Sequence, residues 1–392
     1  MDALPFSSVR LALIREQFRP DGGAERLITR LAEGLQRQGH FEPHLITRSW
    51  QGQPCRFPVV TLSPERSASR KKRQHDFAVA VLRHLSHADY DLVQSHEKIP
   101  GVSIYRAGDG LHAAWLEARA SLLSPLHRWW QQKDPFHRQR LDLERATLEH
   151  PALKAIICPS RQVQHQIEQH YPAQAEKTVL IYNGIDTLTF CPISQDEKRQ
   201  LRQQAGLRAD AFILLFSGSG WQRKGLDTAI KAVGLSGLTS DGQLVVLGQD
   251  KQHARYARQV KKAGLDASLH FVGVADNPLR WNQLADAFIL PSVYEPFSNA
   301  ALEAMACGLP VLLSNVCGAS ELIEDGVQGF RYPAGDAQAF ATALRMLATE
   351  PVRLNQMQTA ARERACEHDV SRMIQDYMTL YTHLLTGKCN SR

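Results

Sequence analysis

The sequence of 392 residues has no uninterrupted run of 18 apolar residues, so we expect no bilayer-spanning helix. Its start, MDALPFSSVRLALIREQF, lacks a basic leader followed by an apolar stretch, and we expect no signal peptide. It has no Cys-x-x-Cys pair, and its seven cysteines are odd in number and widely spaced, which argues against structural zinc and a disulfide framework. These absences favour a cytoplasmic protein, and we expect no metal and no cofactor.

The composition excludes collagen, disorder and a membrane bundle. Hydrophobic residues make up 43% of the chain, charged residues 22% and aromatic residues 7%, the balance of a soluble globular protein. At roughly 100–200 residues per domain, a chain of 392 residues is expected to form two domains. The net charge is +6, and most of the basic excess lies in the first half of the chain.

Short apolar runs alternate with longer helical patterns along the chain, which is typical of βαβ units and parallel sheets. We predict two Rossmann-like α/β domains, 1–183 and 184–367, with a linker at about 183–193 and a cleft between the domains. The remaining residues, 368–392, contain a terminal helix at His368–Leu385. A helix at Ala24–Gln38 illustrates the pattern, because Leu27, Leu31 and Leu35 share one face and Gly39 follows the end.

The predicted strands fall into two groups, one for each domain. Those of the first domain are Val9–Ile14, His44–Thr47, Val59–Leu62, Asp91–Ser95, Val102–Tyr105, Lys154–Cys158 and Val179–Tyr182. Those of the second domain are Phe212–Ser217, Leu244–Gly248, Leu269–Val272, Ala287–Leu290, Val311–Leu313 and Gly329–Tyr332.

Two glutamates eight positions apart mark the segment PSVYEPFSNAALEAMACGLPV. Glu295 follows a predicted strand, and Glu303 lies inside a predicted helix with Ser298 as its N-cap. Ligands of open parallel sheets bind outside the carboxyl ends of the strands, so this loop and the start of the helix, with Ser298 and Asn299, would line the site. Carboxylates there suit the hydroxyl groups of a sugar. A solvated helix with incidental acids is the competing interpretation.

A glycine-rich turn with two cations follows the first predicted strand of the second domain. In FSGSGWQRKGLD, Gly218 and Gly220 allow a ligand to approach the backbone, and Arg223 and Lys224, placed at the start of a helix, can neutralise a diphosphate. The third glycine of a dinucleotide fingerprint and the Lys-Ser/Thr ending of a P-loop are both absent. In the first domain, Gly22 and Gly23 of FRPDGGAER open a helix whose N–H groups could meet an anion. Plain βα turns are the competing interpretation for both segments.

These pieces together resemble the retaining glycosyltransferases of the GT-B architecture (family 4, group 1), which have two Rossmann-like domains. The likeness rests on DGGAER, NGID with Phe190 and Pro192, SGWQRKG, EAMACGLPV with the spaced glutamates, and CGASELIEDGVQGF. Within that family, the segments TRSWQG, HEKIPG, GWQRKGLD and VLGQDK are similar to the bacterial lipopolysaccharide core glucosyltransferases.

The resemblance implies transfer of a hexose, glucose by the closer likeness, from a nucleotide-sugar such as UDP-glucose to a lipid-linked saccharide of the lipopolysaccharide core. It implies retention of the anomeric configuration without a metal ion. Arg223 and Lys224 would bind the diphosphate, Glu295 the sugar hydroxyls, Glu303 the ribose and Gly23 the distal phosphate, and the C-terminal helix would return to the first domain. On this assignment the catalytic residues are Glu295, Arg223 and Lys224. Relatives have an aspartate where this chain has Leu27, so no catalytic aspartate is assigned there.

Residues at the strand ends of the first domain are candidates for acceptor binding or proton handling. His96 and Lys98 follow one strand, and Asp109 and His112 follow the next. Structural roles for these side chains are the competing interpretation. The spacing of Asp89 and Asp91 fits a metal-binding Asp-x-Asp, but the pair precedes its strand and is rejected as a metal site.

Two other classes of function stay open. An NAD-dependent oxidoreductase could use Asp250 for the ribose, although the missing third glycine argues against it. A non-enzymatic protein could bind nucleic acid or an anionic membrane through Trp129 and Trp130 among cations and through a basic run, Arg66, Arg70, Lys71, Lys72 and Arg73. Tryptophans beside cations favour the membrane, so we expect no nucleic-acid partner but a peripheral place on the inner face of the cytoplasmic membrane.

Overall fold

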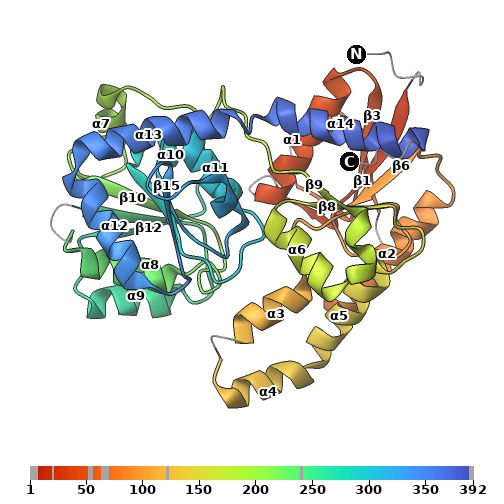
Figure 1. The fold of residues 1–392 in the computed structure, drawn as a ribbon, viewed down its shortest axis with the longest axis horizontal. Coiled ribbons are helices and arrows are strands. Elements are labelled where there is room, and N and C mark those ends of the chain that lie inside the picture. Colours follow the sequence, from red (N-terminus) through yellow and green to blue (C-terminus); the bar gives the residue numbers. More distant parts are fainter. Residues whose placement is uncertain are drawn as a thin grey trace. The chain divides into compact units, whose positions relative to one another are not determined.

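The computed structural model describes residues 8–19, 22–51, 56–62, 70–120, 123–238 and 242–387. The chain forms two compact units, one of Met1–Gly184 with Val370–Arg392, the other of Ile185–Asp369 (Figure 1). Among the described residues, no helix combines the length and the apolar character needed to cross a membrane.

The first unit is built on a seven-stranded parallel sheet with the order β5-β3-β1-β6-β7-β8-β9. Its strands are β1 (Val9–Ile14), β3 (Phe41–Thr47), β5 (Val59–Thr61), β6 (Leu92–Ser95), β7 (Ile104–Arg106), β8 (Ala155–Cys158) and β9 (Thr178–Leu180). Its helices are α1 (Gly23–Arg37), α2 (Arg70–Leu85), α3 (His112–Ala120), α4 (Pro125–Lys133), α5 (Pro135–Leu148), α6 (Arg161–His170) and α14 (Val370–Thr386), with a 3-10 helix η1 (Pro172–Lys177). A separate parallel pair consists of β2 (Gln17–Phe18) and β4 (Ser49–Trp50).

The second unit contains a six-stranded parallel sheet with the order β12-β11-β10-β13-β14-β15. Its strands are β10 (Phe212–Ser217), β11 (Gly242–Leu247), β12 (Leu269–Gly273), β13 (Ala287–Leu290), β14 (Val311–Ser314) and β15 (Gly329–Tyr332). Its helices are α7 (Gln195–Gln204), α8 (Leu226–Ser236), α9 (His253–Lys262), α10 (Pro278–Leu284), α11 (Asn299–Ala306), α12 (Ala337–Thr349) and α13 (Pro351–Cys366), with a 3-10 helix η2 (Gly318–Leu322).

The predicted fold class is confirmed, and every predicted strand is present with its ends moved by at most a few residues. The strands form because short apolar runs, buried on both faces, suit the centre of a parallel sheet. Helix α1 matches its prediction, because Leu27, Leu31 and Leu35 are buried and Gly39, with a φ of 78°, follows its end. The β2–β4 pair was not predicted, because strands of two residues are too short to show an alternating pattern.

The last helix, α14, packs on the first unit. Its residues Met373, Ile374 and Tyr381 join the core formed by α1 and β1. Gly34 of α1 makes this approach possible, because a Cβ there would lie 2.0 Å from Cδ1 of Ile374. Residues from the two ends of the chain therefore share one hydrophobic core.

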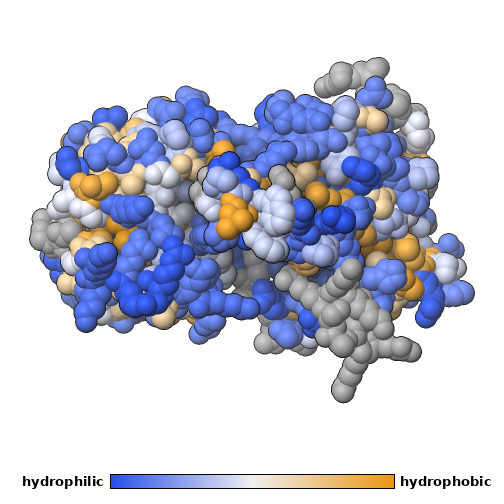
Figure 2. Space-filling model, turned by 90° about the horizontal axis from the view of Figure 1, so that it is seen from below, coloured by the Kyte–Doolittle hydropathy of each residue, from blue (hydrophilic) through white to orange (hydrophobic). Residues whose placement is uncertain are grey.

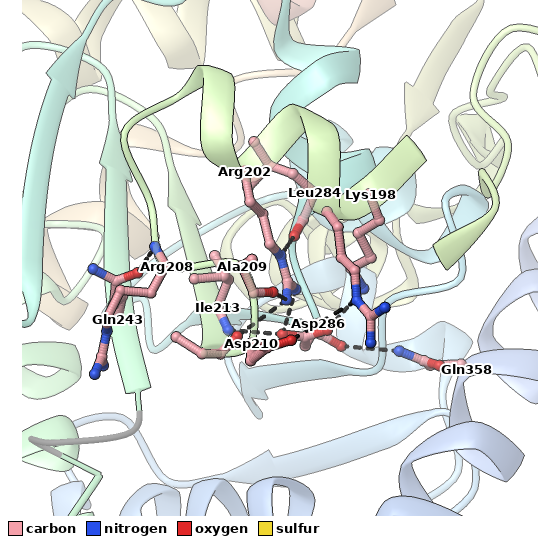
Figure 3. A network of polar contacts seen from close by, with 12 residues as sticks. Lys198, Arg202, Arg208, Ala209, Asp210, Ile213, Gln243, Leu284, Asp286 and Gln358 are labelled. Atoms are coloured by element: carbon pink, nitrogen blue, oxygen red, sulfur yellow. Dashed lines mark hydrogen bonds and ion pairs between the residues drawn. The ribbon is translucent and has the colours of Figure 1, made fainter. Parts of the chain in front are cut away.

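A network of ion pairs holds α7 to the amino edge of the second sheet, where its strands begin (Figure 3). Lys198 Nζ lies 2.7 Å from Asp286 Oδ1, and Arg202 Nη2 lies 2.6 Å from Asp286 Oδ2. The Asp286 carboxylate also accepts the N–H of Ile213 at the start of β10. Figure 3 shows both cations reaching from the same helix toward Asp286, so this network lies at the amino edge of the sheet and has a structural role.

Candidate functional site

The site in the second unit forms where β10 and β13 end. The loop of residues 218–225, here called the cation loop, joins β10 to α8, and Glu295 follows β13. The backbone N–H of Val293 donates to the carbonyl of Arg223 at 2.8 Å, which ties the two segments together. Arg223 and Lys224 lie in this loop just before α8, so the prediction that they start the helix is wrong by a few residues.

Glu295 brings the two cations together. Its Oε2 lies 2.7 Å from Nζ of Lys224 and 3.0 Å from Nη1 of Arg223. The same Nη1 donates to the carbonyl of Tyr294 at 2.8 Å. Burial alone would raise the pKa of Glu295, but Lys224 and Arg223 outweigh it and hold the pKa below its ordinary value. Glu295 is therefore a carboxylate at neutral pH, and the three side chains carry a net positive charge.

Two glycines of the cation loop are required by this geometry. Gly218 has a φ of 139°, and a Cβ there would lie 2.5 Å from Cε of Lys224. Gly225 has a φ of 78°, and a Cβ there would lie 1.9 Å from the carbonyl oxygen of Pro291. Both positions therefore need glycine, one so that the Lys224 side chain can pass and one so that the loop can approach the end of β13.

Helix α11, which begins four residues after Glu295, carries or is capped by the other predicted donor residues of this unit. Ser298 is its N-cap, as predicted, and its hydroxyl accepts the N–H of Ala301 at 3.1 Å. Asn299 is the first helical residue, and Glu303 lies one turn further on and is buried. The site thus combines two cations, two buried carboxylates and a helix N-terminus, an arrangement that can hold a diphosphate next to hydroxyl groups.

A hollow of about 520 Å³ lies at the ends of β11 and β12, next to the cation loop. Trp221 of the cation loop and Phe271 line it, with their rings stacked at 5.3 Å. Asp250, also in its wall, accepts the N–H groups of Trp221 at 2.9 Å and of Gln252 at 2.8 Å. Its carboxylate thus braces the two loops, which disfavours the dinucleotide interpretation.

In the first unit, a second group of charged residues lies where β1, β6 and β7 end. Arg15 is surrounded by three carboxylates, Glu25 from α1 at 3.4 Å, Glu97 at 3.3 Å and Asp109 at 3.4 Å; we call these four residues the Arg15 cluster. Three carboxylates to one guanidinium give it a net negative charge, the opposite of the site around Glu295.

The Glu25 carboxylate also covers the predicted anion site at the start of α1. Gly22 is the N-cap and Gly23 the first helical residue, as an anion site at a helix N-terminus requires. The Glu25 carboxylate folds back over that end, because a Cβ on Gly22 would lie 1.8 Å from Glu25 Oε2. A phosphate that bound there would have to displace this carboxylate.

The remaining acceptor candidates lie at the same edge of the first sheet. His96 follows β6 and is buried. Lys98 Nζ lies 2.7 Å from Oε2 of Glu144, which is completely buried and also accepts the backbone N–H of His112 at 2.5 Å. Lys98 and His112 are thus brought together through Glu144. Burial and the Lys98 ammonium lower the pKa of His112 to about 4, so its ring is neutral at pH 7.

Sequence reasoning missed Arg15, Glu97 and Glu144. Arg15 directly follows β1 and Glu97 comes two residues after β6, so the rule that selected His96 could have found them. Glu144 lies in the middle of α5, and no sequence pattern singles it out.

Asp91 precedes β6 and accepts the N–H of Arg10 at 2.7 Å, consistent with its rejection as a metal ligand. In the basic run, Arg66 and the side chains of Arg70, Lys71 and Lys72 lie outside the described residues.

Comparison with known proteins decides the family. Residues 21–188 match the family model described as Glycosyltransferase Family 4, and residues 197–364 match Glycosyl transferases group 1. The chain is a GT-B glycosyltransferase of these families. This assignment decides against the oxidoreductase and the non-enzymatic alternatives.

Relatives of this glycosyltransferase act on different substrates. The lipopolysaccharide glucosyltransferase WaaG of Escherichia coli K12 is 26% identical over 86% of this chain and 89% of its own length. A D-inositol 3-phosphate glycosyltransferase of Paenarthrobacter aurescens is 28% identical over 83% of this chain and 84% of its own length.

Solved structures share the fold. The crystal structure of WaaG, a glycosyltransferase involved in lipopolysaccharide biosynthesis, has a TM-score of 0.82 at 25% identity, covering 96% of this chain and 100% of that chain. Anabaena HepE in complex with UDP and glucose has a TM-score of 0.74 at 21% identity, covering 95% of this chain and 99% of its own.

Proposed function

We propose that this glycosyltransferase transfers glucose from UDP-glucose to a saccharide of the lipopolysaccharide core, with retention of the anomeric configuration and without a metal ion. The observation that carries the proposal is the arrangement of Arg223, Lys224 and Glu295 where β10 and β13 end. The likeness to WaaG, a lipopolysaccharide glucosyltransferase, supports the acceptor, and the likeness to HepE, whose structure holds UDP and glucose, supports the donor.

The donor half of the reaction needs positive charge at the diphosphate. Breaking the bond to the anomeric carbon develops negative charge on the leaving diphosphate, which Arg223 and Lys224 would stabilise in place of a metal ion. Glu295, held ionised by these cations, would accept hydrogen bonds from the sugar hydroxyls, and Glu303 from the ribose. The hollow beside Trp221 has room for the base. Gly22 and Gly23 remain candidates for donor binding, with the N–H of Gly23 toward the distal phosphate, which would have to displace the Glu25 carboxylate.

Retention follows in this proposal from attack on the same face as the departing diphosphate. The leaving oxygen would take the proton of the acceptor hydroxyl, so no covalent nucleophile is required. The acceptor would bind at the carboxyl edge of the first sheet through His96, Lys98, Asp109 and His112. Carboxylates such as Asp109, whose side chain is 69% exposed, suit the hydroxyl groups of a saccharide.

A direct test is a transfer assay with purified full-length protein. UDP-, GDP- and ADP-glucose, and UDP-galactose, would each be offered with lipopolysaccharide truncated before the outer core, and the linkage of the product would be read by NMR. We expect transfer from UDP-glucose with an α-linked product, unchanged by a chelator. A β-linked product would contradict retention, and transfer from GDP- or ADP-glucose alone would contradict the donor assignment.

We propose further that the first unit attaches to an anionic membrane, because its acceptor is lipid-linked. Helix α4 exposes large apolar side chains, Leu126 at 64%, Trp129 at 46% and Trp130 at 61%. Lys133 lies 4.2 Å above the Trp129 ring, so a cation accompanies the aromatic surface. Figure 2, which views the side on which α4 lies in Figure 1, shows a small apolar patch within hydrophilic surface. Tryptophans beside cations suit the headgroup region.

Vesicle co-sedimentation tests this attachment. Each cation near an anionic surface adds roughly 1 kcal/mol within a Debye length. Binding should therefore rise with the phosphatidylglycerol content and fall with added salt. Trp129→Ser with Trp130→Ser should reduce it, as should neutral substitution of Arg70, Lys71, Lys72 and Arg73. Equal binding to neutral and anionic vesicles, or none at low salt, would contradict the proposal; exposed Val352→Ser of α13 is a matched control.

A further inference from the structure

A chain of hydrogen bonds runs from the C-terminal helix to His96. The hydroxyl of Tyr381 in α14 donates to Oε1 of Gln94 at 2.7 Å. The Nε2 of the same Gln94 side chain lies 3.1 Å from Nε2 of His96. All three side chains are buried, Tyr381 and Gln94 completely. Residues 287 positions apart in the sequence are thus joined to a candidate site residue.

The direction of this chain fixes the proton of the imidazole ring. A buried hydroxyl needs an acceptor for its proton, and the Gln94 carbonyl oxygen accepts that of Tyr381. The amide nitrogen of Gln94, which only donates, therefore faces His96. The Nε2 of His96 must then offer a lone pair, so the ring proton lies on Nδ1. A doubly protonated ring would set an N–H group against the amide NH₂.

The charges around the ring favour the same neutral form. Arg106 of β7 is buried, and its Nε donates to the hydroxyl of Tyr377 at 3.0 Å while its Nη2 donates to Oδ1 of Asn183 at 2.5 Å. Burial lowers the pKa of His96 well below its ordinary value, and the positive charges of Arg106 and of Arg15 lower it further. The charges that act on the ring are therefore those of Arg106 in β7 and of Arg15, which follows β1, and the titratable hydroxyls of the network are Tyr377 and Tyr381 of α14.

We infer that Gln94 and Tyr381 are positioning residues that hold His96 as a neutral imidazole protonated on Nδ1, a hydrogen-bond donor to an acceptor hydroxyl oxygen. Among the described residues, the His96 ring makes no hydrogen bond other than the one to Gln94. Nδ1 therefore stays available at the end of β6, next to β1, where the backbone N–H of His96 bonds to Ile14. The role toward the acceptor rests on the proposed function; the tautomer does not.

The tautomer can be read directly from the full-length protein labelled with ¹⁵N-histidine. Long-range ¹H–¹⁵N correlation spectra distinguish a protonated from a lone-pair nitrogen, and His96→Gln assigns the signal by its loss. We expect the Nδ1–H form in the wild type, persisting unprotonated to below pH 6. An Nε2–H form, or an imidazolium at pH 7, would overturn the inference without any variant and without any activity measurement.

Variants then test the two positioning residues. Gln94→Glu replaces the donor by an acceptor and should move the proton to Nε2 or charge the ring. Tyr381→Phe removes the group that orients the amide and should yield a mixture of tautomers. Tyr377→Phe is the matched control, because its hydroxyl meets Arg106 rather than Gln94, and it should leave the tautomer unchanged. An unchanged tautomer in a folded Gln94→Glu protein would contradict the role of Gln94.

Steady-state kinetics test whether the His96 tautomer contributes to acceptor binding. With UDP-glucose and truncated lipopolysaccharide, Gln94→Glu should raise the KM for the acceptor about tenfold, the loss of roughly one hydrogen bond, and leave the KM for the donor unchanged. If the tautomer shifts while the acceptor KM does not, the positioning holds and the acceptor role of His96 fails. If the wild-type tautomer differs from the prediction, the positioning fails whatever the reaction is.

Discussion

The ion clusters around Glu295 and Arg15, at the carboxyl edges of the two sheets, are opposite in net charge although both edges are built in the same way. In the second unit, one carboxylate, Glu295, is shared by two cations. In the first unit, one guanidinium, Arg15, is shared by three carboxylates. The parallel sheet decides only that strand ends from distant parts of the chain meet at one edge. The side chains placed there give the cluster around Glu295 an excess of donors for anions and the Arg15 cluster an excess of acceptors for hydroxyls.

The network around Asp286 shows why position matters more than residue type. Lys198–Asp286 and Lys224–Glu295 are both lysine–carboxylate pairs at 2.7 Å within the same unit. The first lies where strands begin and joins a helix to the sheet, while the second lies where strands end. The two pairs therefore form a matched comparison of a structural and a functional ion pair.

The largest effect should come from removing one of the two cations that contact Glu295. Lys224→Ala should lower kcat/KM for UDP-glucose by about 100- to 1,000-fold, because the developing charge on the diphosphate loses its counter-charge. Calorimetry should show weaker binding of UDP with little change for uridine, and Arg223→Ala should behave in the same way. Lys198→Ala is the control: it should lower the melting temperature and leave UDP binding unchanged. If Lys224→Ala weakened the binding of UDP and of uridine equally, Lys224 would not be a ligand of the diphosphate.

The carboxylates of the second unit should give the next largest effect. Glu295→Ala and Glu303→Ala should each cost about 1.5–3 kcal/mol in transition-state stabilisation, the value of a charge-assisted hydrogen bond. Glu295→Ala should also lower the melting temperature, because it leaves two cations close together. Steady-state kinetics and thermal unfolding separate these contributions. Wild-type kinetics for either variant would remove that residue from the donor site.

Two glycines of the cation loop offer a finer test of geometry. Gly218→Ala should cost about 1–3 kcal/mol in backbone strain and displace Lys224, whose Cε lies 2.5 Å from the new methyl position. Gly220→Ala also meets a positive φ, of 74°, but nothing lies within 4 Å of its Cβ position. We therefore expect both variants to lose stability and only Gly218→Ala to lose UDP affinity. The same UDP affinity in both would show that the Lys224 position does not matter.

The fold was accessible from the sequence because apolar runs of four to six residues alternate with helical patterns. The strands β10, β13 and β15 agree with their predictions to the residue. The parallel pair of β2 and β4 has no such pattern, and the three helices α3, α4 and α5 after β7 were not predicted as a group. Their position depends on contacts such as Glu144 with the N-terminus of α3, which periodicity does not contain.

The sequence predicted the site residues one by one, but it did not predict which of them contact one another. Strand ends and glycine turns selected Lys224 and Glu295 separately, but their contact joins residues 71 positions apart and depends on side-chain directions. In the same way, Gly22 and Gly23 were selected as an anion site, while the carboxylate of Glu25 that covers it became visible only in the structure. Which charges neutralise one another cannot be derived from spacing along the chain.

The smallest expected effect is the pH dependence of stability. It compares the contribution of Glu295 in the second unit with that of Glu97 in the first unit. The pKa of Glu295 is lowered by Lys224 and Arg223 against the effect of burial, so its contribution to stability is present above its unfolded pKa and lost as pH falls through the folded value. The pKa of Glu97 is raised, mainly by burial and despite Arg15, so its contribution has the opposite sign and is lost as pH rises through its folded pKa. The Glu97 contribution therefore changes above the ordinary glutamate pKa of 4.5, and the Glu295 contribution changes below it. Denaturant unfolding should show a shallower loss of stability on acidification below this value for Glu295→Gln, and a steeper loss above it for Glu97→Gln. Parallel curves for the two variants would mean that the two edges do not differ in the way their charges are balanced.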